Sequence, residues 1–135
     1  MEEIAKLSYA LDTFYFLMSG LLVMWMAAGF TMLESGLVRS KNTVEILTKN
    51  VGLYSISCIM YMLVGYNIMY GDGGSVIPGI SFLVGGDNTV SQVVAGGADA
   101  PYYSDISDFF FQVVFVATAM SIVSGAVAER MKLWS

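Results

Sequence analysis

Three long runs without a charged side chain constrain this chain more than any other feature. The runs cover residues 13–33, 50–71 and 109–128. Since a helix rises about 1.5 Å per residue, about 20 residues cross the roughly 30 Å hydrocarbon core of a bilayer. Each run is long enough to do so. We therefore expect an all-α membrane protein with three transmembrane helices, surrounded by the lipid bilayer.

The few charged residues all lie outside these runs. Lys, Arg, Asp and Glu make up 13% of the chain, and hydrophobic residues make up 56%. A soluble domain would instead spread its charges along amphipathic stripes. The chain has no His and a single Cys, Cys58, so it lacks the residues for a Ser-His-Asp triad or a Cys/His metal site. We therefore expect that the protein is not an enzyme, and that it has no catalytic residues, no cofactor, no metal site and no nucleic-acid partner.

The positions of the basic residues predict the orientation of the helices. Residues 34–49 and the end of the chain are basic, whereas residues 72–108 contain five aspartates and no Lys or Arg. The basic residues concerned are Arg39, Lys41, Lys49, Arg130 and Lys132. Because segments rich in Lys and Arg stay in the cytoplasm, we expect the N-terminus and the acidic segment outside the cell (inner) membrane. The acidic first residues do not resemble a cleavable signal peptide.

The acidic segment 72–108 is also rich in glycine, and the letters GDGG at its start invite comparison with a phosphate-binding loop. Such a loop needs a helix N-terminus and usually a Lys, but this segment has no basic residue. Turn structure outside the membrane explains the glycines better. The aspartates either solvate the segment or weakly concentrate cations near a pore mouth, and solvation is the simpler interpretation.

Small residues recur every four positions in the third run, at Ala117, Ser121 and Gly125. This spacing allows helices to approach closely in a membrane, where lipid provides no hydrophobic drive for association. The pattern predicts that the third helix packs within a bundle.

Phe111 and Phe115 lie four residues apart in the same run, which places them one turn apart on one helical face. They are ordinary packing residues, part of an interfacial aromatic belt, or rings whose faces bind a cation. Cation-π binding is worth about 0.5 to 2 kcal/mol, depending on desolvation.

No Asp, Glu, Lys, Arg or His lies within the runs themselves. Glu34 and Glu129 lie at the predicted cytoplasmic ends. We expect both to form structural salt bridges, with Arg130 as a partner of Glu129 directly or across helices.

Two blocks of the sequence resemble a known family. Block 10–71, which includes GFTMLESGLVRSKNTVEILTKN, resembles the first two transmembrane helices of the ammonium transporters of the Amt/Mep/Rh family. Block 108–130, DFFFQVVFVATAMSIVSGAVAER, resembles the third helix, with its F-Q-x-x-F pair and closing G-A-x-A-E-R. The two blocks come in the family's order, and the resemblance covers essentially all of the chain except the acidic segment between them.

The resemblance implies a protein of about eleven transmembrane helices, N-out and C-in, built from an inverted repeat. It implies a homotrimer with one narrow pore per subunit and ammonium or ammonia as the substrate. Phe111 then corresponds to the phenylalanine of the external ammonium site, and Phe115 to one of two stacked phenylalanines that gate the pore. The role of Gln112 is less defined. The Trp, Ser, Asp and two His residues that complete the family's site and pore belong to later helices.

We therefore expect residues 1–135 to be a partial ammonium transporter domain from an incomplete reading frame, unable to conduct ammonium alone. The alternative is a naturally short three-span membrane protein that packs against and modulates a full-length transporter without conducting. A receptor-like ammonium sensor is a third interpretation. A cytoplasmic regulatory protein is a further partner to test.

Overall fold

The computed structural model describes residues 2–71, 82–95 and 102–132, and every regular element in these ranges is helical. The elements are α1 (Glu2–Leu37), η1 (Ser40–Asn42), α2 (Thr43–Met60), η2 (Tyr61–Gly65), α3 (Tyr66–Tyr70), α4 (Val90–Ala95) and α5 (Asp105–Val127). The all-α prediction is confirmed. The GDGG letters considered as a phosphate loop fall almost wholly outside the described residues.

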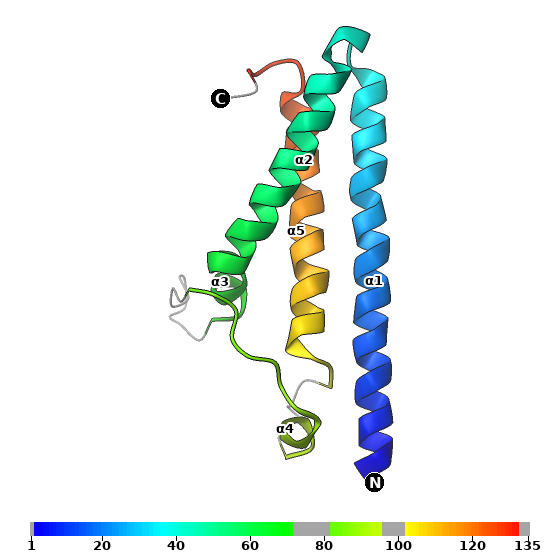
Figure 1. Ribbon diagram of the computed structural model, residues 1–135, viewed down its shortest axis with the longest axis vertical. Helices are drawn as coiled ribbons and strands as arrows, with labels where there is room; N and C mark the ends of the chain where they lie inside the picture. The colour runs from blue at the N-terminus through cyan, green and yellow to red at the C-terminus, as the bar shows by residue number, and fades with distance from the viewer. Residues whose placement is uncertain (1, 72–81, 96–101, 133–135) are drawn as a thin grey trace.

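Three helical segments are long and apolar enough to cross a membrane, namely Glu3–Leu37, Ser40–Tyr70 and Asp105–Val127. In Figure 1, α1 and α5 run in the same direction and α2 runs back against them. We call the end where α1 and α5 begin the N-terminal end of the bundle, and the other end the opposite end. The helices are longer than the charge-free runs predicted from the sequence. Helix α1 also includes Glu34, and α2 begins before Lys49.

Helix α5 is the most buried of the three, because it packs against both α1 and α2. In its most apolar window 33% of the residues are buried, against 6% in each of the other two segments. Ala117 and Thr118 are fully buried, and Ser121 and Ser124 are nearly so. The predicted packing of this helix is confirmed, although Gly125 itself is exposed. Small side chains let the helix backbones approach closely, as expected for a membrane bundle.

Gly20 marks the close approach of α1 to α5. A Cβ atom built on Gly20 would lie 2.7 Å from Cε1 of the Phe110 ring. Carbon atoms in good contact lie about 3.5 to 4.0 Å apart, so no larger residue fits without movement of the ring. The glycine therefore sets the distance between α1 and the part of α5 that carries the aromatic residues.

The second span contains a wide turn, the π-helix η2, between α2 and α3. The N–H of Tyr66 donates to the carbonyl oxygen of Tyr61, five residues earlier. In an ideal α-helix residues five apart point about 140° apart, so they cannot share a face. Here both tyrosine rings contact Phe109 of α5, at centroid distances of 5.9 and 5.5 Å. The π-turn thus directs two tyrosines of one span onto α5.

The start of α5 is held by polar residues that precede it. Ser104 is the N-cap, and its hydroxyl donates to Oδ1 of Asp87 at 2.8 Å. Oδ1 of Asn88 accepts the backbone N–H of Asp105 at 3.2 Å and the hydroxyl of Tyr9 on α1 at 3.1 Å. The bond from Asp105 satisfies one of the first-turn N–H groups that a helix leaves unpaired. Together these bonds fix the first turn of α5 against α1.

Candidate functional site

Four aromatic rings form a chain that links α1 to α5. Phe111 and Phe115 lie one turn apart, with ring centroids separated by 6.2 Å and planes inclined by 34°. Phe16 of α1 meets Phe111 edge-on at 5.9 Å, and Tyr103 packs on Phe16 at 4.3 Å. Phe115 is 48% exposed, whereas Phe111 is half-buried. The two phenylalanines singled out from the sequence therefore lie together, with part of the Phe115 ring open to a ligand or to another helix.

A polar group lies beside these rings on α5. Asp108 is only 3% exposed, and its Oδ2 atom lies 3.5 Å from the hydroxyl of Tyr66, with Tyr70 close enough to interact with the carboxylate. Nε2 of Gln112 donates to the Tyr70 hydroxyl at 3.3 Å. Asp108, Gln112 and Phe115 are spaced i, i+4 and i+7, so they share one face of the helix. A carboxylate, an amide and an aromatic ring thus follow one another along this face.

The charges near the start of α5 affect Tyr103. Burial raises the pKa of the Tyr103 hydroxyl, and the negative charges of Asp108 and Asp105 raise it further. Since the ordinary pKa of tyrosine is about 10, the hydroxyl stays neutral at physiological pH. Tyr103 therefore contributes a neutral hydroxyl group and an aromatic ring beside these aspartates.

A second polar cluster lies at the opposite end of the bundle. Nζ of Lys49 lies 3.3 Å from Oε2 of Glu34 and donates to the carbonyl oxygen of Ser124 at 3.3 Å. The Ser124 hydroxyl lies 3.2 Å from the same Glu34 oxygen and 3.0 Å from Oδ1 of Asn50. Glu34 is 5% exposed, and its Oε1 atom has no hydrogen-bond partner among the described residues. The expected salt bridge of Glu34 is confirmed, and it is a buried one that joins all three long helices.

Glu129 pairs differently from the expectation. Its Oε1 atom accepts the backbone N–H of Arg39 at 3.0 Å and an amide N–H of Asn42 at 2.8 Å, and it pairs with the Arg39 guanidinium at 3.3 Å. The partner is therefore Arg39 rather than Arg130. Glu129 follows the end of α5 with a left-handed φ of 59°, and its carboxylate meets the connection between α1 and α2. These donors, led by the Arg39 backbone N–H, hold the pKa of Glu129 below its ordinary value.

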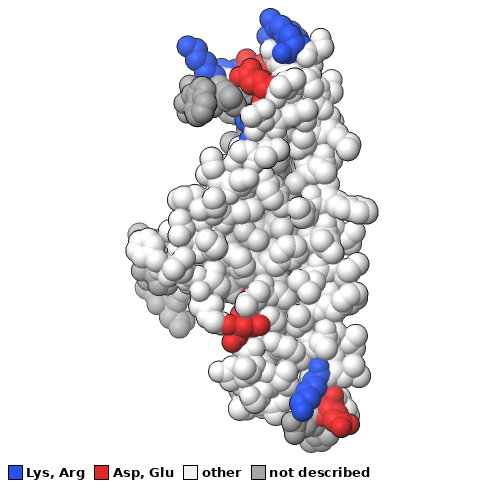
Figure 2. Space-filling model, in the orientation of Figure 1, with Lys and Arg blue, Asp and Glu red and all other residues white. Residues whose placement is uncertain are grey.

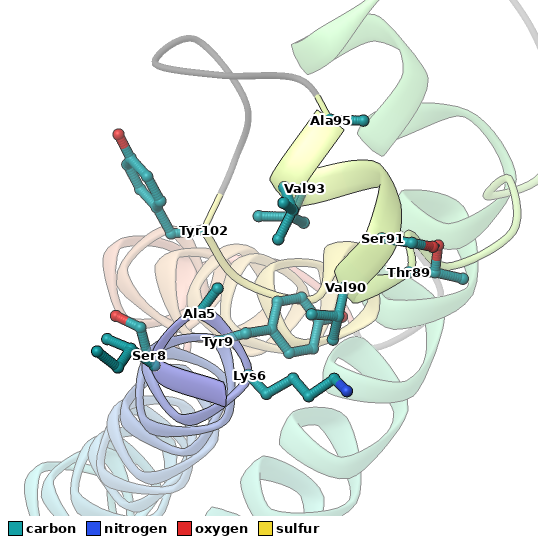
Figure 3. A pocket seen from close by; sticks show the side chains of 12 residues that line it. Ala5, Lys6, Ser8, Tyr9, Thr89, Val90, Ser91, Val93, Ala95 and Tyr102 are labelled. Carbon is teal, nitrogen blue, oxygen red and sulfur yellow. The ribbon is translucent and has the colours of Figure 1, made fainter. Parts of the chain in front are cut away.

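A cavity of about 1090 Å³ lies between α4 and the first turns of α1. Figure 3 shows Lys6 and Tyr9 of α1 facing Val90 and Val93 of α4 across it. Among the described residues, its lining includes the basic Lys6 and contains no Asp or Glu. A positively charged ligand would find no compensating charge there. Neither Phe111 nor Phe115 lines this cavity, so the candidate cation site remains at the aromatic cluster.

Sequence reasoning identified the phenylalanine pair but missed two groups that the structure brings together. Asp108 was counted only as one of five loop aspartates, although it stands three residues before Phe111 and so shares its side of the helix. Lys49 was counted only as an orienting charge. The available signal for a pair was that Lys49 and Glu34 carry opposite charges and lie on either side of the short connection between the first two predicted helices.

Comparison with known proteins identifies similar sequences. A model of the Ammonium Transporter Family matches residues 14–135. The chain is 39% identical to the putative ammonium transporter sll1017 of Synechocystis, over 96% of the chain and 28% of that protein. It is 45% identical to putative ammonium transporter 1 of Caenorhabditis elegans, over 88% of the chain and 20% of that protein. It is 37% identical to ammonium transporter Amt2 of Archaeoglobus fulgidus, over 90% and 24%. The chain thus spans about a quarter of the length of these curated relatives, which are named as transporters.

Proposed function

The chain belongs to the ammonium transporter family, and from this premise we propose that the complete protein carries ammonium or ammonia across a membrane through a pore in each subunit. Helix α5 contributes one wall of that pore, with Phe111 at the ammonium site and Phe115 at the gate. The three long apolar helices agree with an integral membrane protein.

The observation that carries this proposal is the arrangement of Phe111 and Phe115 on α5. The edge-on contact with Phe16 holds the Phe111 ring in place. A ring held in this way offers its face to a cation without a further cost of ordering. Phe115, one turn deeper in α5 and partly exposed, is placed to obstruct a hydrated ion that leaves Phe111.

The charges support an orientation for the transporter. Arg39, Lys41, Arg130 and Lys132 belong to the opposite end of the bundle, where the α1–α2 connection and the end of α5 lie. Figure 2 shows a broad band without charged side chains between the charged groups near the two ends. By the positive-inside rule the opposite end lies on the cytoplasmic side of the cell (inner) membrane, so the N-terminus and Phe111 lie toward the outside.

The exposed surface of α1 and α2 supports further partners. Large apolar residues such as Trp25 are highly exposed along these helices. Lipid, the remaining helices of the subunit and neighbouring subunits of a homotrimer would cover them. The same surface also fits the alternative of a short three-span protein that packs against and modulates a full-length transporter without conducting. A cytoplasmic regulatory protein would bind at the opposite end.

The test is uptake of labelled methylammonium by the complete protein in cells that lack their own ammonium transporters. Phe111→Ala should raise the half-saturation concentration roughly twofold to thirtyfold, which corresponds to about 0.5 to 2 kcal/mol of cation-π binding. Phe115→Ala should change uptake and its selectivity. Phe14→Ala is the matched control, because Phe14 is an exposed α1 residue outside the aromatic chain. Absence of uptake by the wild type would contradict the proposed function, and equal half-saturation in the Phe111 variant would contradict its role.

A further inference from the structure

Asp108 is a buried carboxylate without a cationic partner in the described part of the chain. Among the described residues, ion pairs join Glu129 to Arg39 and Glu34 to Lys49, and neither pair involves Asp108. An ionised carboxylate that is removed from water without a counter-charge carries a large desolvation cost. At 3% exposure, Asp108 has little contact with solvent to offset that cost.

The groups around Asp108 are neutral hydroxyls and aromatic rings. The Tyr66 hydroxyl is 3.5 Å from the carboxylate, which is long for a hydrogen bond between oxygens. The Tyr70 hydroxyl lies near the same carboxylate, and the Tyr66 and Tyr70 rings pack with their centroids 4.9 Å apart. Each hydroxyl that donates to the carboxylate keeps lone pairs with which it can accept. The surroundings of Asp108 therefore offer a carboxylate, hydroxyl groups that can accept hydrogen bonds, and aromatic faces.

We propose that Asp108, with the hydroxyls of Tyr66 and Tyr70, binds an ammonium ion one helical turn before Phe111. This inference rests on the proposed function and adds a binding site to it. A carboxylate oxygen and hydroxyl lone pairs accept N–H donors, and the tyrosine rings attract the same charge.

The position of Asp108 on α5 indicates that ammonium meets this site before it reaches Phe111. Phe111 follows three residues later on α5, which is a rise of about 4.5 Å along the helix. Gln112 lies on the same side and is joined to Tyr70 by a hydrogen bond. A cation that leaves the carboxylate therefore meets the Phe111 ring next. In this arrangement Asp108 raises the local concentration of ammonium, and Phe111 and Phe115 act on it afterwards.

A purely structural role for Asp108 is the competing explanation. A negative charge in the first turn of a helix interacts favourably with the helix dipole. Asp105 is already an acidic residue in that turn. Asp87 accepts hydrogen bonds from the hydroxyl of the N-cap residue Ser104 and from the backbone N–H of Ile106. The dipole thus does not require a second, buried aspartate surrounded by tyrosines.

The experiment uses Asp108→Asn in the complete protein, with Asp105→Asn as the matched control in the same turn. Uptake of labelled methylammonium is measured against concentration, and the size-exclusion profile in detergent verifies folding. Loss of a hydrogen bond to a charged group predicts a half-saturation concentration raised roughly tenfold for Asp108→Asn. Asp105→Asn should leave it within about twofold. Tyr66→Phe, which removes one hydroxyl without removing the ring, should give a smaller increase than Asp108→Asn.

A binding measurement separates the site from transport. Ammonium chloride should raise the thermal unfolding midpoint of the purified wild type more than potassium or sodium chloride does, and Asp108→Asn should lose part of that increase. An unchanged half-saturation in a folded Asp108→Asn variant would overturn the site while leaving the proposed function intact. Equal protection by potassium would overturn ammonium as its ligand. If the wild type shows neither uptake nor protection by ammonium, the proposed function itself fails.

Discussion

Replacing Lys49 by Met should destabilise the protein strongly, because it leaves the buried carboxylate of Glu34 without its counter-charge. The two side chains are 19% and 5% exposed, and their charged atoms lie 3.3 Å apart. Met matches the length of the Lys stem but cannot donate to Glu34 or to the carbonyl oxygen of Ser124. Among the described residues, the carboxylate would then keep a single hydrogen-bond partner, the Ser124 hydroxyl.

The magnitude follows from the asymmetry of buried ion pairs. Removal of one partner typically costs about 3 to 5 kcal/mol, because an uncompensated charge stays in a low-dielectric environment. Lys49 retains some contact with solvent, so we expect a loss in unfolding free energy at the lower end, about 3 kcal/mol. The double variant Glu34→Gln/Lys49→Met carries no buried charge, and its glutamine can still bond to Ser124. We expect it to recover about 2 kcal/mol of that loss.

Equilibrium unfolding of the purified complete protein, titrated with sodium dodecyl sulfate in detergent micelles and followed by circular dichroism, measures these differences. Lys41→Met is the control, because Lys41 is exposed and should change stability by less than about 0.5 kcal/mol. A loss below about 1 kcal/mol for Lys49→Met, or simple additivity in the double variant, would refute the claim that the pair is buried and coupled.

Two further predictions concern helix packing and pH. Gly20→Ala places a methyl group against the Phe110 ring and should lower the unfolding free energy by about 1 to 3 kcal/mol in the same assay. The control is Gly29→Ala, which should not destabilise the protein because no atom lies within 4 Å of its new Cβ. Equal effects of the two substitutions would contradict the close approach of α1 to α5. The pKa of Glu129 is lower in the folded state than its ordinary 4.5, so its stabilisation is present above that pH and is lost as pH falls through the lowered value. The unfolding midpoints of wild type and Glu129→Gln should therefore differ at neutral pH and converge in acid, and a difference independent of pH would count against the Arg39 contact.

Local sequence was sufficient for the helices and for the phenylalanine pair. Bilayer thickness sets the length of an apolar run, so hydropathy alone predicted three spanning helices. The spacing of Ala117 and Ser121 predicted the buried side of α5, and the spacing of Phe111 and Phe115 placed their rings together. Each of these inferences uses residues within one helix, where the helical repeat fixes relative positions. The family resemblance added the expected roles of the two phenylalanines, which remain predictions.

The contacts between helices could not be obtained in this way. Glu129 binds a residue 90 positions away, and the choice of Arg39 over Arg130 depends on the left-handed turn after α5. The π-turn that directs Tyr66 onto α5 has no clear signature in hydropathy, because it changes the phase of the helix without changing its composition.

The sequence by itself thus determined that this protein is a set of membrane-crossing helices of the ammonium transporter family, and which side of its third helix packs. Only the tertiary structure decided that Glu34 and Lys49 form a buried pair and that Asp108 is enclosed by tyrosines from another span. The physical reason is that hydrophobicity and helical period act along the chain. The environment of a charge is instead set by which helices meet around it.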